Sequence, residues 1–109
     1  MHTDAPTFAD TDWPSVVALY DQLLVVAPTP VVELNRAVAI AEIRGAESGL
    51  AIVDALDLPQ WHLSHATRAE LLARLDRTGE ARGAYGQALD LVTNDAERRH
   101  LEARLAALD

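Results

Sequence analysis

Apolar side chains recur at intervals of three and four residues along most of this 109-residue chain. In the first clear stretch they stand at Val16, Leu19, Tyr20, Leu23 and Leu24, which is the spacing of one face of an α-helix. This pattern predicts a helix over residues 13–27. The same pattern predicts five more helices, over residues 30–44, 46–56, 60–76, 80–92 and from about residue 95 to the C-terminus. No segment of useful length alternates apolar and polar residues with a period of two, so no strands are expected.

Residues that begin or end helices separate these segments. Thr11 or Asp12 can cap the first helix, and Pro28 ends it because the residue before a proline is pushed out of the helical region. Gly45 is suited to end the second helix, since glycine readily adopts the left-handed backbone of a C-terminal cap. Short turns between helices of this length are typical of helical hairpins. The sequence therefore predicts an all-α domain over residues 11–109, preceded by a flexible segment, residues 1–10.

The two halves of the chain match each other at a nearly fixed offset. Arg36 falls over Arg68, and Asp21 falls over Asp54, when one half is shifted along the other. The shift that aligns them is close to the period of a helix–turn–helix repeat, which is about 34 residues. This offset favours a stack of hairpins over a simple bundle.

The residues within that period resemble a tetratricopeptide (TPR) repeat. Ala81, Tyr85 and Ala88 match the small and aromatic positions of its second helix, and Ala69 and Leu72 match the small and large positions of its first helix. Departures from the consensus stand at Gly49, Val53, Asp76 and Thr93. The resemblance implies a TPR-like solenoid of about six helices: one orphan helix, two repeats and a C-terminal capping helix.

A narrower resemblance covers nearly the whole chain. The segments "TDWPSVVALYDQLLVVAPTPVVELNRAVAIAE", "GLAIVDAL", "RAELLARLDRTGEARGAYGQAL" and "NDAERRHLEARLAAL", in this order, resemble the C-terminal extension of extracytoplasmic-function (ECF) bacterial RNA polymerase sigma factors that carry TPR-like repeats. Sigma regions two and four, which recognise promoters and bind core polymerase, are not in this chain. The resemblance implies an interaction domain that regulates sigma activity in transcription initiation. Its expected partners are the sigma domains of the parent chain or a regulatory protein, with RNA polymerase reached only through the parent chain.

Composition restricts the function classes further. Seventeen acidic residues stand against nine arginines, and a net charge of −8 repels a phosphate backbone, so we expect no nucleic-acid binding by this chain. Cysteine is absent, which excludes a disulfide framework and fits a cytoplasmic location. No stretch approaches the roughly 20 apolar residues of a membrane span, so no membrane association is expected.

Two arginines within apolar helical patterns are the candidate site residues. Asp21 precedes Arg36, and Asp54 precedes Arg68, at nearly equal separations, so adjacent antiparallel helices can bring each pair together. One interpretation is a repeated structural Asp–Arg bridge between neighbouring repeats, because unpaired charges are rarely buried. The other is a partner-binding groove lined by Asn35, Arg36 and Arg68, whose guanidinium groups would bind the carboxylates of a peptide. The structural interpretation is preferred.

Signals for other chemistry are weak. His62 and His65 could share one face at the start of a helix, but helical zinc motifs add a carboxylate and a third ligand, so neither a metal nor another cofactor is expected. No nucleophile–base order or glycine-rich phosphate loop is present, so an enzyme is not expected. The alternatives are a stand-alone TPR-like adaptor unrelated to transcription and, ranked below it, a small-molecule or metal-binding helical domain. A homodimer through the uncovered first helix is a further alternative, because a terminal repeat lacks one neighbour.

Overall fold

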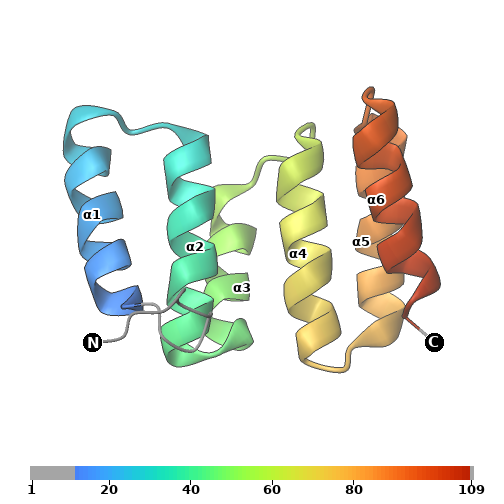
Figure 1. Cartoon of the computed structure of the whole chain (residues 1–109), viewed down its shortest axis with the longest axis horizontal. Helices are drawn as coiled ribbons and strands as arrows, with labels where there is room; N and C mark the ends of the chain where they lie inside the picture. Colours follow the sequence, from blue (N-terminus) through green and yellow to red (C-terminus); the bar gives the residue numbers. More distant parts are fainter. Residues whose placement is uncertain (1–11, 109) are drawn as a thin grey trace, which may run out of the picture.

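Six α-helices make up the computed structural model, which describes residues 12–108 (Figure 1). The helices are α1 (Trp13–Val26), α2 (Pro30–Arg44), α3 (Ala46–Leu56), α4 (His62–Arg74), α5 (Thr78–Leu91) and α6 (Asp95–Ala106). The described residues contain no strand. The predicted all-helical fold with six helices is therefore confirmed for this part of the chain. The segment 1–10, predicted to be flexible, lies outside the described residues.

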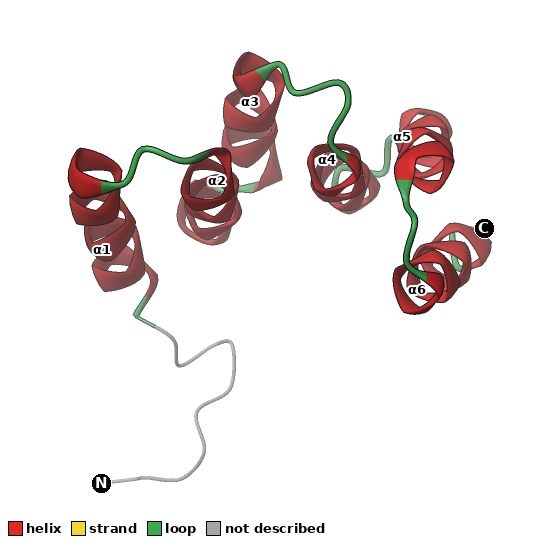
Figure 2. Cartoon of the chain, turned by 90° about the horizontal axis from the view of Figure 1, so that it is seen from above, coloured by secondary structure: helices red, strands yellow, loops and turns green. Residues whose placement is uncertain are grey.

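Helices that are neighbours in sequence lie side by side and antiparallel, and each contacts mainly the helices before and after it. Seen from above, the helices follow an arc with α1 and α6 at its two ends and α3 on its outer side (Figure 2). Helices α1, α3 and α5 begin at residues 13, 46 and 78, and helices α2, α4 and α6 begin at residues 30, 62 and 95. Both series advance by nearly constant steps that equal the offset between the matching halves of the sequence. The sequence offset is thus also the spacing of the helices.

The helix starts and ends have local causes in the sequence. Asp12 caps α1: its Oδ1 accepts a hydrogen bond from the Ser15 backbone N–H (3.3 Å) and its Oδ2 one from the Ser15 hydroxyl (2.7 Å). The hydroxyl bond, followed by the backbone bond, lowers the pKa of Asp12. Thr29 and Asn94 cap α2 and α6 in the same way, through Val32 N and Glu97 N.

The fourth and fifth helices differ in extent from their predicted ranges. Helix α4 begins at His62 rather than residue 60, because the chain is still turning at Trp61, whose N–H bonds to the Leu58 carbonyl. Helix α4 also ends earlier, and α5 begins earlier, because Asp76 has a left-handed backbone with φ of 60°. Asp76 stands where the TPR consensus prefers glycine, and aspartate is among the residues that tolerate this conformation best.

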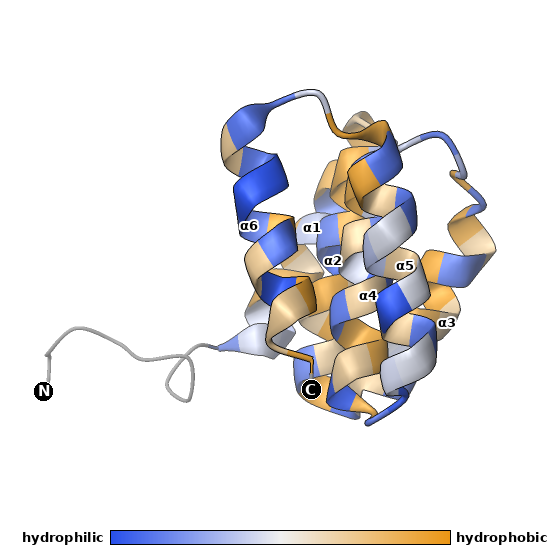
Figure 3. Cartoon of the chain, turned by 90° about the vertical axis from the view of Figure 1, so that its right-hand side faces the viewer, coloured by the Kyte–Doolittle hydropathy of each residue, from blue (hydrophilic) through white to orange (hydrophobic). Residues whose placement is uncertain are grey.

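The main core runs through α2, α3, α4 and α5, with one buried residue from α6. Its largest fully buried side chains are Tyr85, Leu71 and Leu72. A second, smaller cluster joins α1 to α2 through Val17, Ala39 and Ile40. The two terminal helices are less deeply packed, since Val17 is the one buried residue of α1 and Leu101 that of α6. Helix α6 is largely hydrophilic along its length (Figure 3).

Candidate functional site

A groove of about 330 Å³ lies between α4 and α6, and one side chain each from α2 and α5 also lines it. We call it the α4–α6 groove. Its lining residues are Val38, His62, Leu63, Ala66, Thr67, Glu70, Leu71, Arg74, Tyr85, Glu97, His100, Leu101 and Arg104. Because α6 forms one wall, the groove exists only while α6 is docked on α5.

The buried part of the groove lining is apolar. Leu71, Tyr85 and Leu101 are buried there, and each belongs to the main core. Leu63, on α4, is 38% exposed and presents an apolar surface at the groove. An apolar base with a charged rim is the usual anatomy of a site that holds a side chain of a partner.

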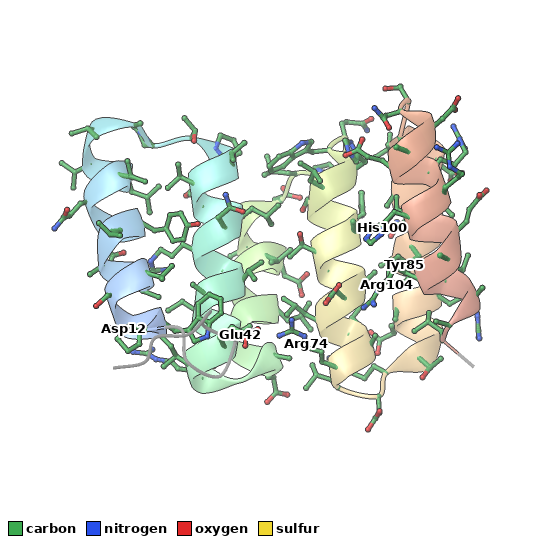
Figure 4. The ribbon with its side chains drawn as sticks, viewed as in Figure 1. Asp12, Glu42, Arg74, Tyr85, His100 and Arg104 are labelled. Atoms are coloured by element: carbon green, nitrogen blue, oxygen red, sulfur yellow. The ribbon has the colours of Figure 1, made fainter. Side chains whose placement is uncertain are left out.

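A chain of ion pairs crosses this face from α2 to α6. Arg74 of α4 donates from Nη1 to Glu42 Oε2 on α2 at 2.8 Å, and its Nη2 lies 3.5 Å from Glu70 Oε2. The other oxygen of Glu70 lies 3.3 Å from Arg104 Nη2 on α6. Figure 4 shows Glu42 and Arg74 facing each other between α2 and α4, and Arg104 between α4 and α6. The carboxylate of Glu70 is therefore shared by two arginines.

Arg104 is held at the groove by two partners. A hydrogen bond with the side chain of Tyr85 and, next, the negative charge of Glu70 raise the pKa of Arg104 above its usual value. At another point of the groove, His62 Nε2 lies 3.2 Å from Glu97 Oε2, which links α4 to α6 again. Polar contacts thus supplement Leu101 in holding α6 against the rest of the domain.

Arg36 and Arg68, the arginines selected from the sequence, each contact the aspartate expected for them. Arg36 Nε donates to Asp21 Oδ1 at 2.7 Å, which joins α2 to α1. Arg68 Nε donates to Asp54 Oδ1 at 2.8 Å, which joins α4 to α3. The arginine side chains are about a third exposed, so these pairs are only partly shielded from water.

Neither arginine lines the α4–α6 groove. Arg68 contributes instead to a smaller pocket of about 140 Å³ where the α3–α4 turn meets α4. Arg36 and the exposed Asn35 line neither pocket. The two aspartate–arginine pairs were therefore predicted from the sequence, whereas the position of the α4–α6 groove was not.

These ion pairs are expected to contribute little to stability. In a double-mutant cycle of Asp21→Asn and Arg36→Gln, followed by urea unfolding, we expect a coupling free energy of about 0.2–1 kcal/mol, because the pair is half exposed and screened. The Asp54–Arg68 cycle is a matched control and is expected to fall in the same range. A coupling above roughly 2 kcal/mol in either cycle would contradict this expectation.

The ion pair between Glu42 and the groove residue Arg74 had a sequence signal that was missed. The offset that relates Arg36 to Arg68 also relates Glu42 to Arg74. The first two residues are of the same type. Glu42 and Arg74, by contrast, are opposite in charge, and they lie on α2 and α4. His100 and Arg104 had no comparable signal, because nothing in the sequence of α6 indicates which of its faces is turned to α4.

The two histidines considered for metal binding have separate partners. His62 faces Glu97, whereas His65 Nε2 lies 2.8 Å from the carbonyl oxygen of Pro59 in the α3–α4 turn. Among residues 12–108, no group of three or more His, Cys, Asp or Glu side chains is placed to hold a metal ion. Within the same range, no helix is both long and apolar enough to cross a bilayer.

Comparison with known proteins gives one informative similarity. The chain is 38% identical over 107 residues to an uncharacterized protein of Rhizobium meliloti (strain 1021), and the match covers 96% of this chain and 25% of that protein. The chain thus spans about a quarter of the length of that relative, whose name assigns no activity. No protein-family model and no solved structure matches the chain.

Proposed function

We propose that this chain is a TPR-like interaction domain of an ECF-type sigma factor, and that the α4–α6 groove is where it binds. The observation that carries the interaction role is the groove itself, with its buried apolar base and its rim of paired charges. The sigma-factor context rests on the sequence resemblance over nearly the whole chain. The nearly constant offset between successive helix starts supports the TPR-like architecture.

The chemistry of the groove indicates what kind of segment would bind. An apolar side chain of the partner would enter between α4 and α6 and cover Leu63 and Leu101. Charged groups of the partner would compete for Glu70, whose contacts to Arg74 and Arg104 are long, at 3.5 and 3.3 Å. Such a segment exchanges existing ion pairs for new ones, so its affinity would depend on salt concentration.

Net charge favours the sigma domains of the same polypeptide as the partner. Regions that recognise promoter DNA present basic surfaces to the phosphate backbone. The whole chain carries a net charge of −8, so it attracts such surfaces and repels DNA. If the domain docks on these basic surfaces through its groove, they are less available to DNA while the groove is occupied by them. A regulatory protein that occupies the groove would then change sigma activity.

The first experiment is transcription from a target promoter by the full-length sigma factor. Deletion of residues 12–108 is expected to change promoter-dependent transcription by about fivefold or more, the usual size of an allosteric coupling. Leu63→Glu should change transcription in the same direction, because it places a charge on the apolar side of the groove.

Ile43→Glu is the matched control for Leu63→Glu. Ile43 is 41% exposed, close to the 38% of Leu63, but it lies on α2 and lines neither pocket. It is expected to leave transcription unchanged. Unaltered activity and regulation after deletion of the whole domain would remove the proposal.

The alternative is a stand-alone adaptor, for which the same groove would bind an unrelated protein. The coding sequence upstream distinguishes the two, since the sigma proposal requires regions two and four in the same polypeptide. The relative from Rhizobium meliloti is several times as long as the matched segment, which supports a multidomain parent.

A further inference from the structure

The lining of the α4–α6 groove combines buried apolar side chains with basic side chains around them. Leu71 and Leu101 are buried, and Leu63 is 38% exposed beside them. The volume of about 330 Å³ falls within the roughly 300–1,000 Å³ that is usual for small-molecule sites. The groove therefore has room for a compact apolar body, and the charged groups of the lining determine which functional group that body carries.

Two nitrogen donors of α6 face the groove one helical turn apart. His100 and Arg104 are four positions apart, so their side chains share one face of the helix, and both line the groove. Figure 4 shows both side chains between α6 and α4. Among residues 12–108, His100 has no hydrogen-bond or ion-pair partner. Its imidazole is therefore available to a ligand.

Glu70 occupies the position between two arginines that the carboxylate of a ligand would take. Its contacts to Arg74 and Arg104 are long, at 3.5 and 3.3 Å. Each arginine also has another partner: Arg74 donates to Glu42 at 2.8 Å, and Arg104 bonds to the side chain of Tyr85. A competing carboxylate can thus replace Glu70 while both arginines keep these other contacts. The fit of Glu70 itself shows that a carboxylate suits this position.

The excess negative charge of the described chain lies away from the groove. Residues 12–58 contain seven acidic residues and two arginines, whereas residues 59–108, which supply all but one of the lining residues, contain seven of each. The lining itself contains two glutamates, two arginines and two histidines. Attraction between whole domains depends on the charge of the whole chain, but a small ligand is selected by the groups that it touches. The lining therefore carries no excess of negative charge against an anionic ligand.

We propose that the α4–α6 groove binds a small organic acid with an apolar body. The body lies against Leu63 and Leu101. The carboxylate accepts hydrogen bonds from His100 and Arg104 and displaces Glu70 from the guanidinium group. This inference rests on the proposed function in one respect, because both use the α4–α6 groove as the binding site. A bound acid fills the space that a side chain of the sigma domains would enter, so it is an effector that releases those domains from the groove.

The test uses three probes with the same apolar body, namely 4-phenylbutanoate, 4-phenylbutanamide and 4-phenylbutylamine, each added to the whole chain with isotope-labelled methyl groups. The acid is expected to cause saturable shifts at the methyls of Leu63 and Leu101, and to bind about tenfold more tightly than the amide. The amine is expected to bind no better than the amide. Equal affinities of acid and amide overturn the proposal, and so does tighter binding of the amine, since the groove would then select cations.

Glu70→Gln distinguishes the two signs of charge most sharply. It removes a like charge beside the bound carboxylate, so binding of the acid is expected to strengthen by about threefold or more. A groove that binds cations through Glu70 would give the opposite result, and weaker binding of the acid by this variant contradicts the inference.

Arg104→Gln and His100→Ala are each expected to weaken binding of the acid by about threefold or more, because each removes a donor to the carboxylate. His100→Ala breaks no polar contact within the described part of the chain, so its effect is separate from any loosening of α6. Arg99→Gln is the matched control, since Arg99 is exposed on α6 and lines neither pocket. It is expected to bind the acid as the parent does, and unchanged binding by His100→Ala and Arg104→Gln as well would overturn the proposed position of the carboxylate.

Failure of this inference can be told apart from failure of the proposed function. Absence of saturable binding by the acid overturns the inference, whereas a change in transcription caused by Leu63→Glu would still support the groove as a contact site of the sigma domains. Binding of the acid together with unaltered transcription after deletion of the domain supports the ligand site and removes the sigma role.

Discussion

Replacement of Tyr85 by alanine is expected to lower the free energy of unfolding by about 3–5 kcal/mol, the usual cost of deleting a fully buried aromatic side chain. Tyr85 is one of the largest fully buried side chains and lies where α5, α4 and α6 meet. Its removal leaves a cavity beneath the α4–α6 groove and takes away a hydrogen-bond partner of Arg104. Urea unfolding followed by far-UV circular dichroism measures the loss.

Tyr85→Phe separates packing from hydrogen bonding. It retains the ring and removes only the hydroxyl that Arg104 contacts, so a loss of about 1 kcal/mol is expected. If phenylalanine were as destabilising as alanine, the hydrogen bond to Arg104 rather than packing of the ring would be the dominant contribution. The ring would then not have the role that its burial indicates.

Gly49→Ala is expected to destabilise the domain by about 1–3 kcal/mol, even though alanine is the better helix former. The added Cβ would overlap both the Ala41 side chain and the Ala37 backbone carbonyl, and a backbone atom cannot move aside without separating α3 from α2. The midpoint of chemical unfolding measures the change.

Gly83→Ala is the matched control for this prediction. Gly83 also lies inside a helix, but no atom lies within 4 Å of the position that its Cβ would take. No steric overlap opposes the higher helix propensity of alanine at this position, so a stabilisation of up to about 1 kcal/mol is expected. The same substitution is thus predicted to have opposite signs at two glycines, and equal effects at both would contradict the close α2–α3 contact.

The two ends of the domain differ in the side chains that they expose. Helix α1 exposes leucine and valine side chains, whereas α6 exposes mainly charged ones. Charged residues suit a helix that closes a stack, and apolar residues suit one that continues it. The polar contacts of Glu97 and Arg104 help to hold α6 against α4. Because salt screens such contacts, a high salt concentration is expected to loosen α6 before it destabilises the main core.

Much of the local structure was determined by the sequence alone. The start of α1 follows from an aspartate cap and a proline, and the end of α2 follows from Gly45, whose φ of 101° is costly for other residues. These signals act over a few residues, so no distant contact is needed to interpret them. The aspartate–arginine pairs were also predictable, because short turns force adjacent helices to be antiparallel and this fixes which residues lie opposite.

The tertiary structure alone decided where the groove lies and which residues line it. Whether Glu70 faces Arg104, and whether His62 faces Glu97, depends on how far α6 is rotated and tilted on α5, and a hydrophobic pattern with one buried leucine leaves that angle undefined. The sequence predicted that the first helix would be uncovered, because a terminal repeat lacks one neighbour, but only the tertiary structure shows that Leu19 and Leu23 are the side chains left exposed. Periodicity specifies which side of a helix is apolar, but only packing specifies whether anything covers it.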